Sequence, residues 1–174
     1  MSPPPPAAPT AGGSAEPRPL AVFDVDGVLA DVGHRVHHLE GPRKNWRAFF
    51  AGAANDPPLS LGIELAAELS ADHDLGYLTG RPESLRQVTQ LWLSHHGLPA
   101  GPLWMRAPGD FRAARVMKLE AVRQLAAERA VTVVIDDDEQ VVGALREAGF
   151  AVLQATWAEH SRTLQRAQEE QGRT

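Results

Sequence analysis

The sequence predicts an α/β fold, a three-layer sandwich in which helices cover both faces of a mainly parallel five-stranded sheet. Three observations lead to this class. Short apolar runs recur along the chain, stretches with helical periodicity separate them, and polar residues follow directly on three of the runs. Strands that alternate with helices form right-handed βαβ units, which build parallel sheets covered on both faces. Polar residues at strand ends are typical of such sheets, because ligands bind outside the carboxyl ends of the strands.

Each element has its own local signal. Short apolar runs predict strands at residues 20–23, 75–79, 103–105, 131–135 and 151–153. Apolar residues at helical spacing predict helices at residues 60–71, 83–96, 111–129, 141–148 and 157–170. Gly97 and Gly149 follow two of these helices, where glycine is the usual C-terminal cap. The chain between residue 24 and Pro58 is irregular, apart from a short helix expected around Trp46 to Phe50.

Length and composition limit the organisation. The 174 residues fit one domain, and 43% hydrophobic content supplies its core. Residues 1–19 are rich in Pro and Ala, so we expect a disordered tail there, a folded domain at 20–156, and a C-terminal helix and tail at 157–174. The absence of cysteine excludes disulfides, thiolate zinc sites and a cysteine nucleophile. We find neither a secretory signal nor a membrane-spanning run, and therefore expect a cytoplasmic location without a membrane partner.

Charge is distributed unevenly. A net charge of −5 argues against indiscriminate binding to duplex nucleic acid. The segment 34–47 nevertheless has a local excess of Arg and Lys, with histidines between them. This basic run is either a solvated surface or a face that meets phosphate groups.

Two carboxylates follow the first predicted strand. Asp24 and Asp26 come directly after the apolar run 20–23, and Gly27 follows them. Carboxylates are rarely buried unless they are paired or bind a metal, and Mg²⁺ prefers oxygen ligands. Gly27 permits a sharp turn or a close backbone approach. The same spacing also occurs in plain loops, so the rest of the chain has to decide between the two interpretations.

Two further polar groups follow later strands. Thr79, Gly80 and Arg81 end the second predicted strand, and Asp136 with Asp137 ends the fourth. The Thr79 hydroxyl and the Gly80 amide suit a phosphate oxygen, although the same stretch also resembles a helix N-cap. Because parallel strands end at one edge, we expect these groups to converge.

A lysine stands out in the predicted helix 111–129. The sequence has 17 basic residues of the Lys and Arg types, and Lys44 and Lys118 are its lysines. A lysine in such an arginine-rich chain indicates a need for a compact ammonium group. About 4 Å from a carboxylate, that charge interacts by about 4 kcal/mol at an effective dielectric of about 20, enough to hold Asp24 ionised. The alternative is an ordinary exposed helix lysine.

The four sites, in this order, resemble the four motifs of the haloacid dehalogenase (HAD) superfamily of phosphohydrolases. The resemblance covers residues 20 to about 155. It implies a Rossmann-like, HAD-like fold and a phosphomonoesterase that uses Mg²⁺ and an aspartyl-phosphate intermediate. The 27–58 segment suffices for the turn and flap of that family and a small cap-like element, so we expect a minimal cap domain or none, and a comparatively open site.

A closer likeness lies between the second and third motifs. Arg106, Gly109, Asp110 and Arg112, followed five residues later by Lys118, resemble the Arg-x-x-Gly-Asp-x-Arg-x5-Lys pattern of the 3′-phosphatase domain of phage-type polynucleotide kinases. The stretch 135–142 is also similar to that group, except that Asp138 stands where that domain often has Arg. The sequence has no Gly-x4-Gly-Lys-Ser/Thr phosphate loop, so we expect no kinase activity from it.

The resemblance assigns roles to single residues. Asp24 would be the nucleophile, Asp26 the general acid and base, and Lys118 the neutralising cation. The remaining assignments are Thr79, Gly80, Arg81, Arg106 and Arg112 for phosphate or substrate, and Asp24, Asp26 through its carbonyl, Asp136 and Asp137 for Mg²⁺.

The substrate and the class of protein have alternatives. An open site fits a phosphorylated nucleic-acid 3′ end, whereas a small phosphorylated metabolite or nucleotide is an equal candidate. A response-regulator receiver also uses acids, Thr and Lys, but its acidic pair comes early, and here the strongest cluster is at Asp136. A non-catalytic phosphate-binding module on the same fold is the third alternative. The sequence specifies no oligomeric state.

Overall fold

A computed structural model describes residues 17–159 and 161–172 of the chain, and the predicted α/β class is confirmed. Its centre is a five-stranded sheet in the order β3-β2-β1-β4-β5, and every neighbouring pair of strands is parallel. The strands are β1 (Leu20–Phe23), β2 (Asp74–Pro82), β3 (Leu103–Arg106), β4 (Val131–Asp136) and β5 (Val152–Gln154). Most of the tail expected at 1–19 lies outside the described residues.

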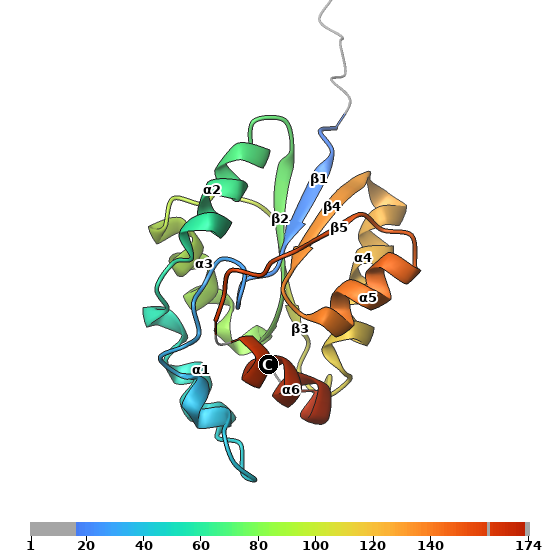
Figure 1. Ribbon diagram of the computed structural model, residues 1–174. Coiled ribbons are helices and arrows are strands. Elements are labelled where there is room, and N and C mark those ends of the chain that lie inside the picture. Colours follow the sequence, from blue (N-terminus) through green and yellow to red (C-terminus); the bar gives the residue numbers. More distant parts are fainter. Residues whose placement is uncertain (1–16, 160, 173–174) are drawn as a thin grey trace, which may run out of the picture.

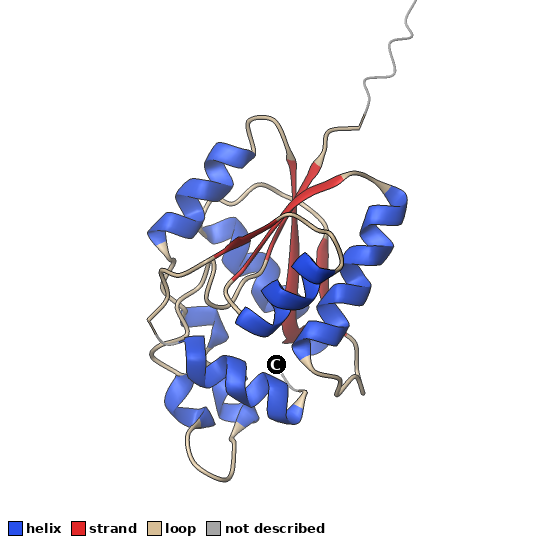
Figure 2. Ribbon diagram, turned by 45° about the vertical axis from the view of Figure 1, so that its right-hand side comes forward, coloured by secondary structure: helices blue, strands red, loops and turns tan. Residues whose placement is uncertain are grey.

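Helices cover both faces of the sheet, as the alternating sequence pattern predicts (Figure 1). The helices α2 (Ser60–Leu69) and α3 (Arg86–His95) lie on one face, and α4 (Ala114–Glu128) and α5 (Glu139–Glu147) lie on the other. The helices α1 (Trp46–Ala51) and α6 (Ser161–Gln171) lie instead beyond the carboxyl ends of the strands (Figures 1 and 2). Short 3₁₀ turns occur at Val36–Leu39, Ala53–Asn55 and Glu83–Leu85.

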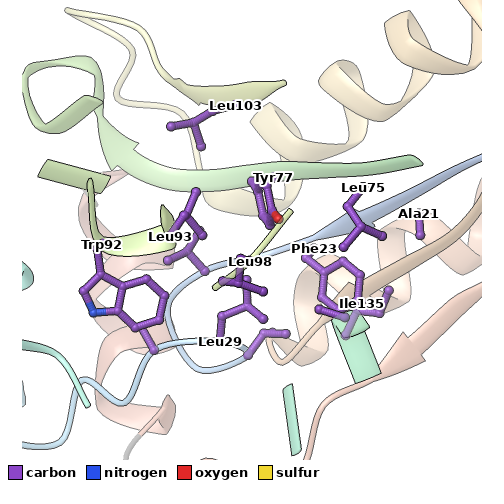
Figure 3. Close-up of a cluster of buried hydrophobic side chains, with 14 of the residues drawn as sticks. Ala21, Phe23, Leu29, Leu75, Tyr77, Trp92, Leu93, Leu98, Leu103 and Ile135 are labelled. Atoms are coloured by element: carbon purple, nitrogen blue, oxygen red, sulfur yellow. The ribbon is translucent and has the colours of Figure 1, made fainter. Parts of the chain in front are cut away.

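The central strand β1 is apolar on both sides, because it is covered on both sides. Ala21 and Phe23 point into a cluster with Tyr77 and Trp92 on the α2 and α3 side (Figure 3). Alternate residues of β1 enter the cluster formed with α4 and α5. All four residues of β1 are fully buried, so the carboxylate of Asp24 emerges directly from the core.

A third apolar cluster lies at the carboxyl edge of the sheet. It joins the segment 27–58 to α6, with Trp46 and Phe49 from α1 and Leu164 and Ala167 from α6. The Trp46 indole nitrogen also donates to the Gln171 side-chain oxygen over 2.8 Å. The segment 27–58 therefore forms a small cap-like layer that packs against the C-terminal helix.

Several boundaries differ from those expected, for local reasons. β2 continues to Pro82, so Gly80 and Arg81 also belong to the strand, which was expected to end at Thr79. The next helix opens with the 3₁₀ turn Glu83–Leu85, and the extended backbone of Pro82 separates this turn from β2. α4 begins at Ala114, three residues later than predicted. The residues before it form a loop, and Arg106 holds this loop through the Asp110 and Arg112 carbonyls. Within the described residues, no helix combines the length and apolarity needed to cross a membrane.

Candidate active site

The carboxyl ends of β1 and β4 bring an ammonium group between two carboxylates. Lys118, on α4, donates from Nζ to Asp24 Oδ2 and to Asp136 Oδ2, each over 2.7 Å. The side chain of Lys118 is 3% exposed, so both ion pairs are shielded from water. Adjacent parallel strands explain the meeting, because the Asp24 amide donates to the Ile135 carbonyl over 2.9 Å. The alternative of an exposed helix lysine is wrong.

Burial strongly affects the charges of this group. Burial, with contributions from Asp136 and Asp137, raises the pKa of Asp24 well above its usual value, although Lys118 opposes the shift. Burial likewise raises the pKa of Asp137 to about 7, with Asp136 adding to the effect. Burial lowers the pKa of Lys118, but the two carboxylates outweigh it and raise that pKa above the usual range. Carboxylates held together away from water need further positive charge.

Three of these carboxylates fit a divalent cation. One oxygen from each of Asp24, Asp136 and Asp137 lies within 4.8 Å of the others, and all three residues are buried. A set of carboxylate oxygens suits Mg²⁺, and the excess of negative charge is the kind that such an ion compensates. The Asp26 carboxylate is not in this cluster, so a role for Asp26 in metal binding is left to its backbone carbonyl, as expected from the sequence.

Gly27 permits the close packing at this cluster. Its φ is +83°, a left-handed conformation that favours glycine, and a Cβ at this position would lie 2.3 Å from Asp137 Oδ2. The turn after β1 therefore passes directly against the carboxylate that follows β4. The glycine of the Asp-x-Asp-Gly motif is required both by backbone conformation and by space.

Asp26 belongs to a second buried network. Its Oδ1 accepts hydrogen bonds from Arg81 Nε over 3.0 Å and from Arg35 Nη2 over 2.9 Å. Both guanidinium groups also bind Asp56, with Arg81 Nη2 and Arg35 Nη2 each 2.7 Å from Asp56 Oδ2. His34 Nε2 lies 2.8 Å from Asp56 Oδ1. The two arginines thus join two aspartates far apart in the sequence.

This network sets the charge of Asp26. Burial raises its pKa, but Arg81 and Arg35 together outweigh burial, and the net pKa is below the usual value. The general-acid role that the resemblance implies needs a proton on this carboxyl group, whereas two guanidinium groups favour its ionised form. All of these hydrogen bonds reach Oδ1, which leaves Oδ2 as the oxygen suited to exchange a proton.

Thr79 and Gly80 lie at the same edge of the sheet. β2 is paired with β1 in the register Phe23↔Tyr77, so Thr79 stands level with the start of the turn after β1. Its hydroxyl oxygen accepts a hydrogen bond from the Arg81 amide over 3.2 Å, and the residue is 1% exposed. The helix N-cap interpretation is wrong, because the 3₁₀ turn starts after Pro82 and has no side-chain cap.

The other predicted substrate residues organise a loop. Arg106 ends β3, and its Nη1 donates to the Arg112 carbonyl over 2.8 Å and to the Asp110 carbonyl over 3.3 Å. Arg112 points outward, with a side chain 48% exposed, and pairs with Asp110 and Glu120. Arg106 thus fixes the loop that starts α4, while Arg112 lies at its surface.

Sequence reasoning missed three residues of this region. Arg35 belongs to the basic run 34–47 and was expected on a solvated face or against phosphate, yet it is 1% exposed. Asp56 is 2% exposed and accepts hydrogen bonds from both Arg35 and Arg81. Gln165, on α6, donates to Asp137. None of the three carried a local sequence signal, because the segment 27–58 holds several acids and bases and each contact depends on how distant parts of the chain pack.

Fold and site together define a class. The central strand of the parallel sheet ends in Asp-x-Asp, and a lysine bridges the first aspartate to the acidic pair at the end of the neighbouring strand. A protein with this arrangement is a phosphatase of the HAD type. A family model for the polynucleotide kinase PNKP phosphatase domain matches residues 19–160. The chain therefore belongs to this family, and the resemblance seen in its motifs is confirmed.

Solved structures share the fold. A chain in "Structure of the Pnkp1/Rnl/Hen1 RNA repair complex" is 20% identical, with a TM-score of 0.69 over 86% of this chain and 46% of that chain. This chain thus spans about half the length of that relative. A class C acid phosphatase from Bacillus anthracis with tungstate bound is 16% identical, with a TM-score of 0.58 over 83% and 69% of the two chains.

A haloacid dehalogenase-like hydrolase from Streptococcus pneumoniae is 17% identical, with a TM-score of 0.57 over 87% of this chain and 91% of that chain. At such low identities, these likenesses establish the fold. Among curated proteins, no sequence matches this chain.

Proposed function

We propose that this phosphatase hydrolyses phosphate monoesters with Mg²⁺ through an aspartyl-phosphate on Asp24, and that its substrate is a polynucleotide 3′-phosphate. The observation that carries the chemistry is the position of Asp24, which lies 2.7 Å from Lys118 and within one cluster with Asp136 and Asp137. Lys118 supplies one positive charge that favours the approach of an anionic phosphate, although the cluster of three carboxylates keeps an excess of negative charge. When bound there, Mg²⁺ would offset the repulsion between nucleophile and phosphoryl oxygens.

In the first step, an oxygen of Asp24 attacks phosphorus and the ester P–O bond breaks. The leaving oxygen takes a proton, and Asp26 Oδ2 is the group that would supply it. The hydrogen bonds from Arg81 and Arg35 to Oδ1 can persist while Oδ2 is protonated. Thr79 and the Gly80 amide would then hold the phosphoryl oxygens. Lys118 opposes the rise in the pKa of Asp24 that burial causes, and Mg²⁺ bound at the cluster would add positive charge that favours the ionised nucleophile.

In the second step, water attacks the phosphorus of the aspartyl-phosphate. Asp26 takes the water proton, the bond between Asp24 and phosphorus breaks, and inorganic phosphate leaves. The lowered pKa of Asp26 suits this step, because an ionised carboxylate is the form that acts as base. Its proton from the second step restores the acid for the next turnover.

Family membership supports the polynucleotide substrate, together with the exposed basic residues of the segment 34–47. Arg47 lies on α1 and Arg43 in the loop before it, and both are exposed. A nucleic-acid chain beyond the 3′ end would pass over this part of the cap-like layer. A small phosphorylated metabolite or nucleotide is the second candidate, and it is favoured by the burial of Asp24, which is 5% exposed. The cytoplasmic location and the domain boundaries expected from the sequence stay predictions.

The chemistry is tested with Asp24→Asn. This substitution keeps the size of the side chain and its contact with Lys118 but removes the nucleophile, so Mg²⁺-dependent hydrolysis of p-nitrophenyl phosphate should vanish while the circular dichroism spectrum stays unchanged. Full activity in the variant would contradict the mechanism.

The substrate is tested separately, with 3′- and 5′-phosphorylated oligonucleotides beside mononucleotides and sugar phosphates. A preference for a small ester would reject the polynucleotide proposal and leave the chemistry standing.

A further inference from the structure

A side chain from the C-terminal helix reaches the predicted metal cluster. Gln165, on α6, donates from Nε2 to Asp137 Oδ2 over 2.9 Å and to the Asp137 backbone carbonyl over 3.1 Å. The family match ends at residue 160, so α6 lies outside it. The contact therefore belongs to a part of this chain to which the family likeness assigns no role.

The two hydrogen bonds show which atom of the Gln165 amide faces Asp137. Both partners on Asp137 are acceptors, and an amide can meet two acceptors at once only with its NH₂ group. One nitrogen thus holds the backbone and the carboxylate of the same residue. The same carboxylate also lies against Gly27, where a Cβ would lie 2.3 Å from Oδ2. Asp137 is consequently in contact with both the turn after β1 and the helix α6, and it is 6% exposed.

α6 is fixed by contacts that do not involve Gln165. Leu164 and Ala167, on either side of it, are buried in the third apolar cluster. The Trp46 indole bonds to Gln171 over 2.8 Å, and Arg115 Nε on α4 bonds to Glu169 over 2.8 Å. Because the helix is anchored to both the cap-like layer and α4, the position of Gln165 is set before any ligand arrives.

We propose that Gln165 is a positioning residue, which holds the Asp137 carboxylate in the orientation that binds the divalent cation and so makes α6 a part of the active site. The inference rests on the proposed Mg²⁺-dependent function. A carboxylate whose other contacts are fixed loses less orientational freedom on binding a metal, and outer partners of metal ligands typically contribute about 10- to 100-fold in affinity or activity.

The test measures metal binding directly. Gln165→Met keeps the length of the side chain but removes the donor, and Gln165→Ala removes the side chain. Mn²⁺, an oxygen-seeking substitute for Mg²⁺, is titrated into each protein, and the free ion is counted by electron paramagnetic resonance. Both variants should bind Mn²⁺ about tenfold more weakly than wild type, and the Mg²⁺ concentration for half-maximal p-nitrophenyl phosphate hydrolysis should rise to match.

Glu169→Gln is the matched control, because it weakens the link between α6 and α4 without touching Asp137. It should bind Mn²⁺ like wild type. Binding within twofold of wild type in both Gln165 variants would overturn the inference, as would an equal loss in the Glu169 control, which would assign the effect to helix anchoring. Failure of the wild type itself to bind Mn²⁺ would instead overturn the proposed Mg²⁺ dependence, and the inference with it.

Discussion

The buried position of Lys118, between two carboxylates, suits a lysine better than an arginine. Its Nζ lies 2.7 Å from both Asp24 and Asp136 in a pocket with almost no solvent. A compact ammonium bridges the two oxygens, whereas the planar guanidinium of arginine is wider and directs its donors in a fixed fork. The arginine-rich composition of the chain is consistent with this requirement, since a lysine stands at this position.

We therefore predict that Lys118→Arg loses activity although it keeps the charge. The decrease in kcat/KM for p-nitrophenyl phosphate should be about 10²-fold, comparable to the loss of one preorganised electrostatic group. Arg123→Lys, an exchange at an exposed position of the same helix, is the control and should keep wild-type kinetics. A Lys118→Arg enzyme within fivefold of wild type would show that the charge suffices without the shape.

Gly27 combines a backbone requirement with a steric one. We predict that Gly27→Ala destabilises the fold by about 1–2 kcal/mol, the usual penalty for a left-handed alanine, and also displaces Asp137. Gly41 has a similar φ of +78°, and no atom lies within 4 Å of the place that a Cβ would take, so Gly41→Ala carries the backbone penalty alone. Urea unfolding should show both costs, whereas phosphatase activity should fall in the Gly27 variant and persist in the Gly41 variant.

The segment 27–58 is fixed to the sheet by buried ion pairs as well as by apolar contacts. Arg35 and Asp56, both in this segment, meet Arg81 and Asp26 at the strand ends. A buried network of this kind does not guarantee stability, because its charges lose hydration. Removing one member, however, leaves the opposite charges buried and uncompensated, so the network holds the cap-like layer in one position.

Asp56→Ala should therefore be strongly destabilising, by about 3–5 kcal/mol, because two buried guanidinium groups would then share Asp26 alone. Asp72 provides a matched control, since its side chain is 77% exposed beside His73, and Asp72→Ala should change stability by about 0.5 kcal/mol or less. Free energies of unfolding from urea titrations compare the two. A small effect at Asp56 would mean that water enters the network and hydrates the arginines.

Features that depend on neighbouring residues in the sequence were predicted, whereas contacts between residues far apart in the sequence were not. Strands and helices were predictable because apolar periodicity is local. Asp24 and Asp136 were predictable because each follows or ends an apolar run, and Lys118 because it is a rare lysine in an arginine-rich chain. The contact from Gln165 to Asp137 spans 28 residues and depends on how α6 packs, which no local pattern specifies. The pairing of Arg35 with Asp56, 21 residues away, likewise depends on how the irregular segment folds back.

Some basic residues of the segment 34–47 are buried in ion pairs, and others are exposed to solvent. Arg35 is buried in the network, and Lys44 approaches Glu170 of α6 at 3.7 Å. Arg43 and Arg47 are left exposed on the cap-like layer, on a chain whose net charge is −5. Against an acidic background, two exposed arginines on the cap-like layer are a local attraction for phosphates beyond the reacting one.

If a nucleic-acid 3′ end is the substrate, replacing Arg43 and Arg47 together by Gln should raise KM for a 3′-phosphorylated oligonucleotide. The dependence of log(kcat/KM) on log[salt] should also flatten by about 0.7 for each phosphate that the variant no longer neutralises, because fewer counterions are released on binding. Hydrolysis of p-nitrophenyl phosphate should stay constant, since a small ester reaches no further than the phosphate site.

Arg123 and Arg146, exposed on α4 and α5, give a control pair with the same change in net charge. Equal effects in the two pairs would assign the attraction to overall charge, whereas an effect confined to Arg43 and Arg47 places the path of the nucleic acid over the cap-like layer.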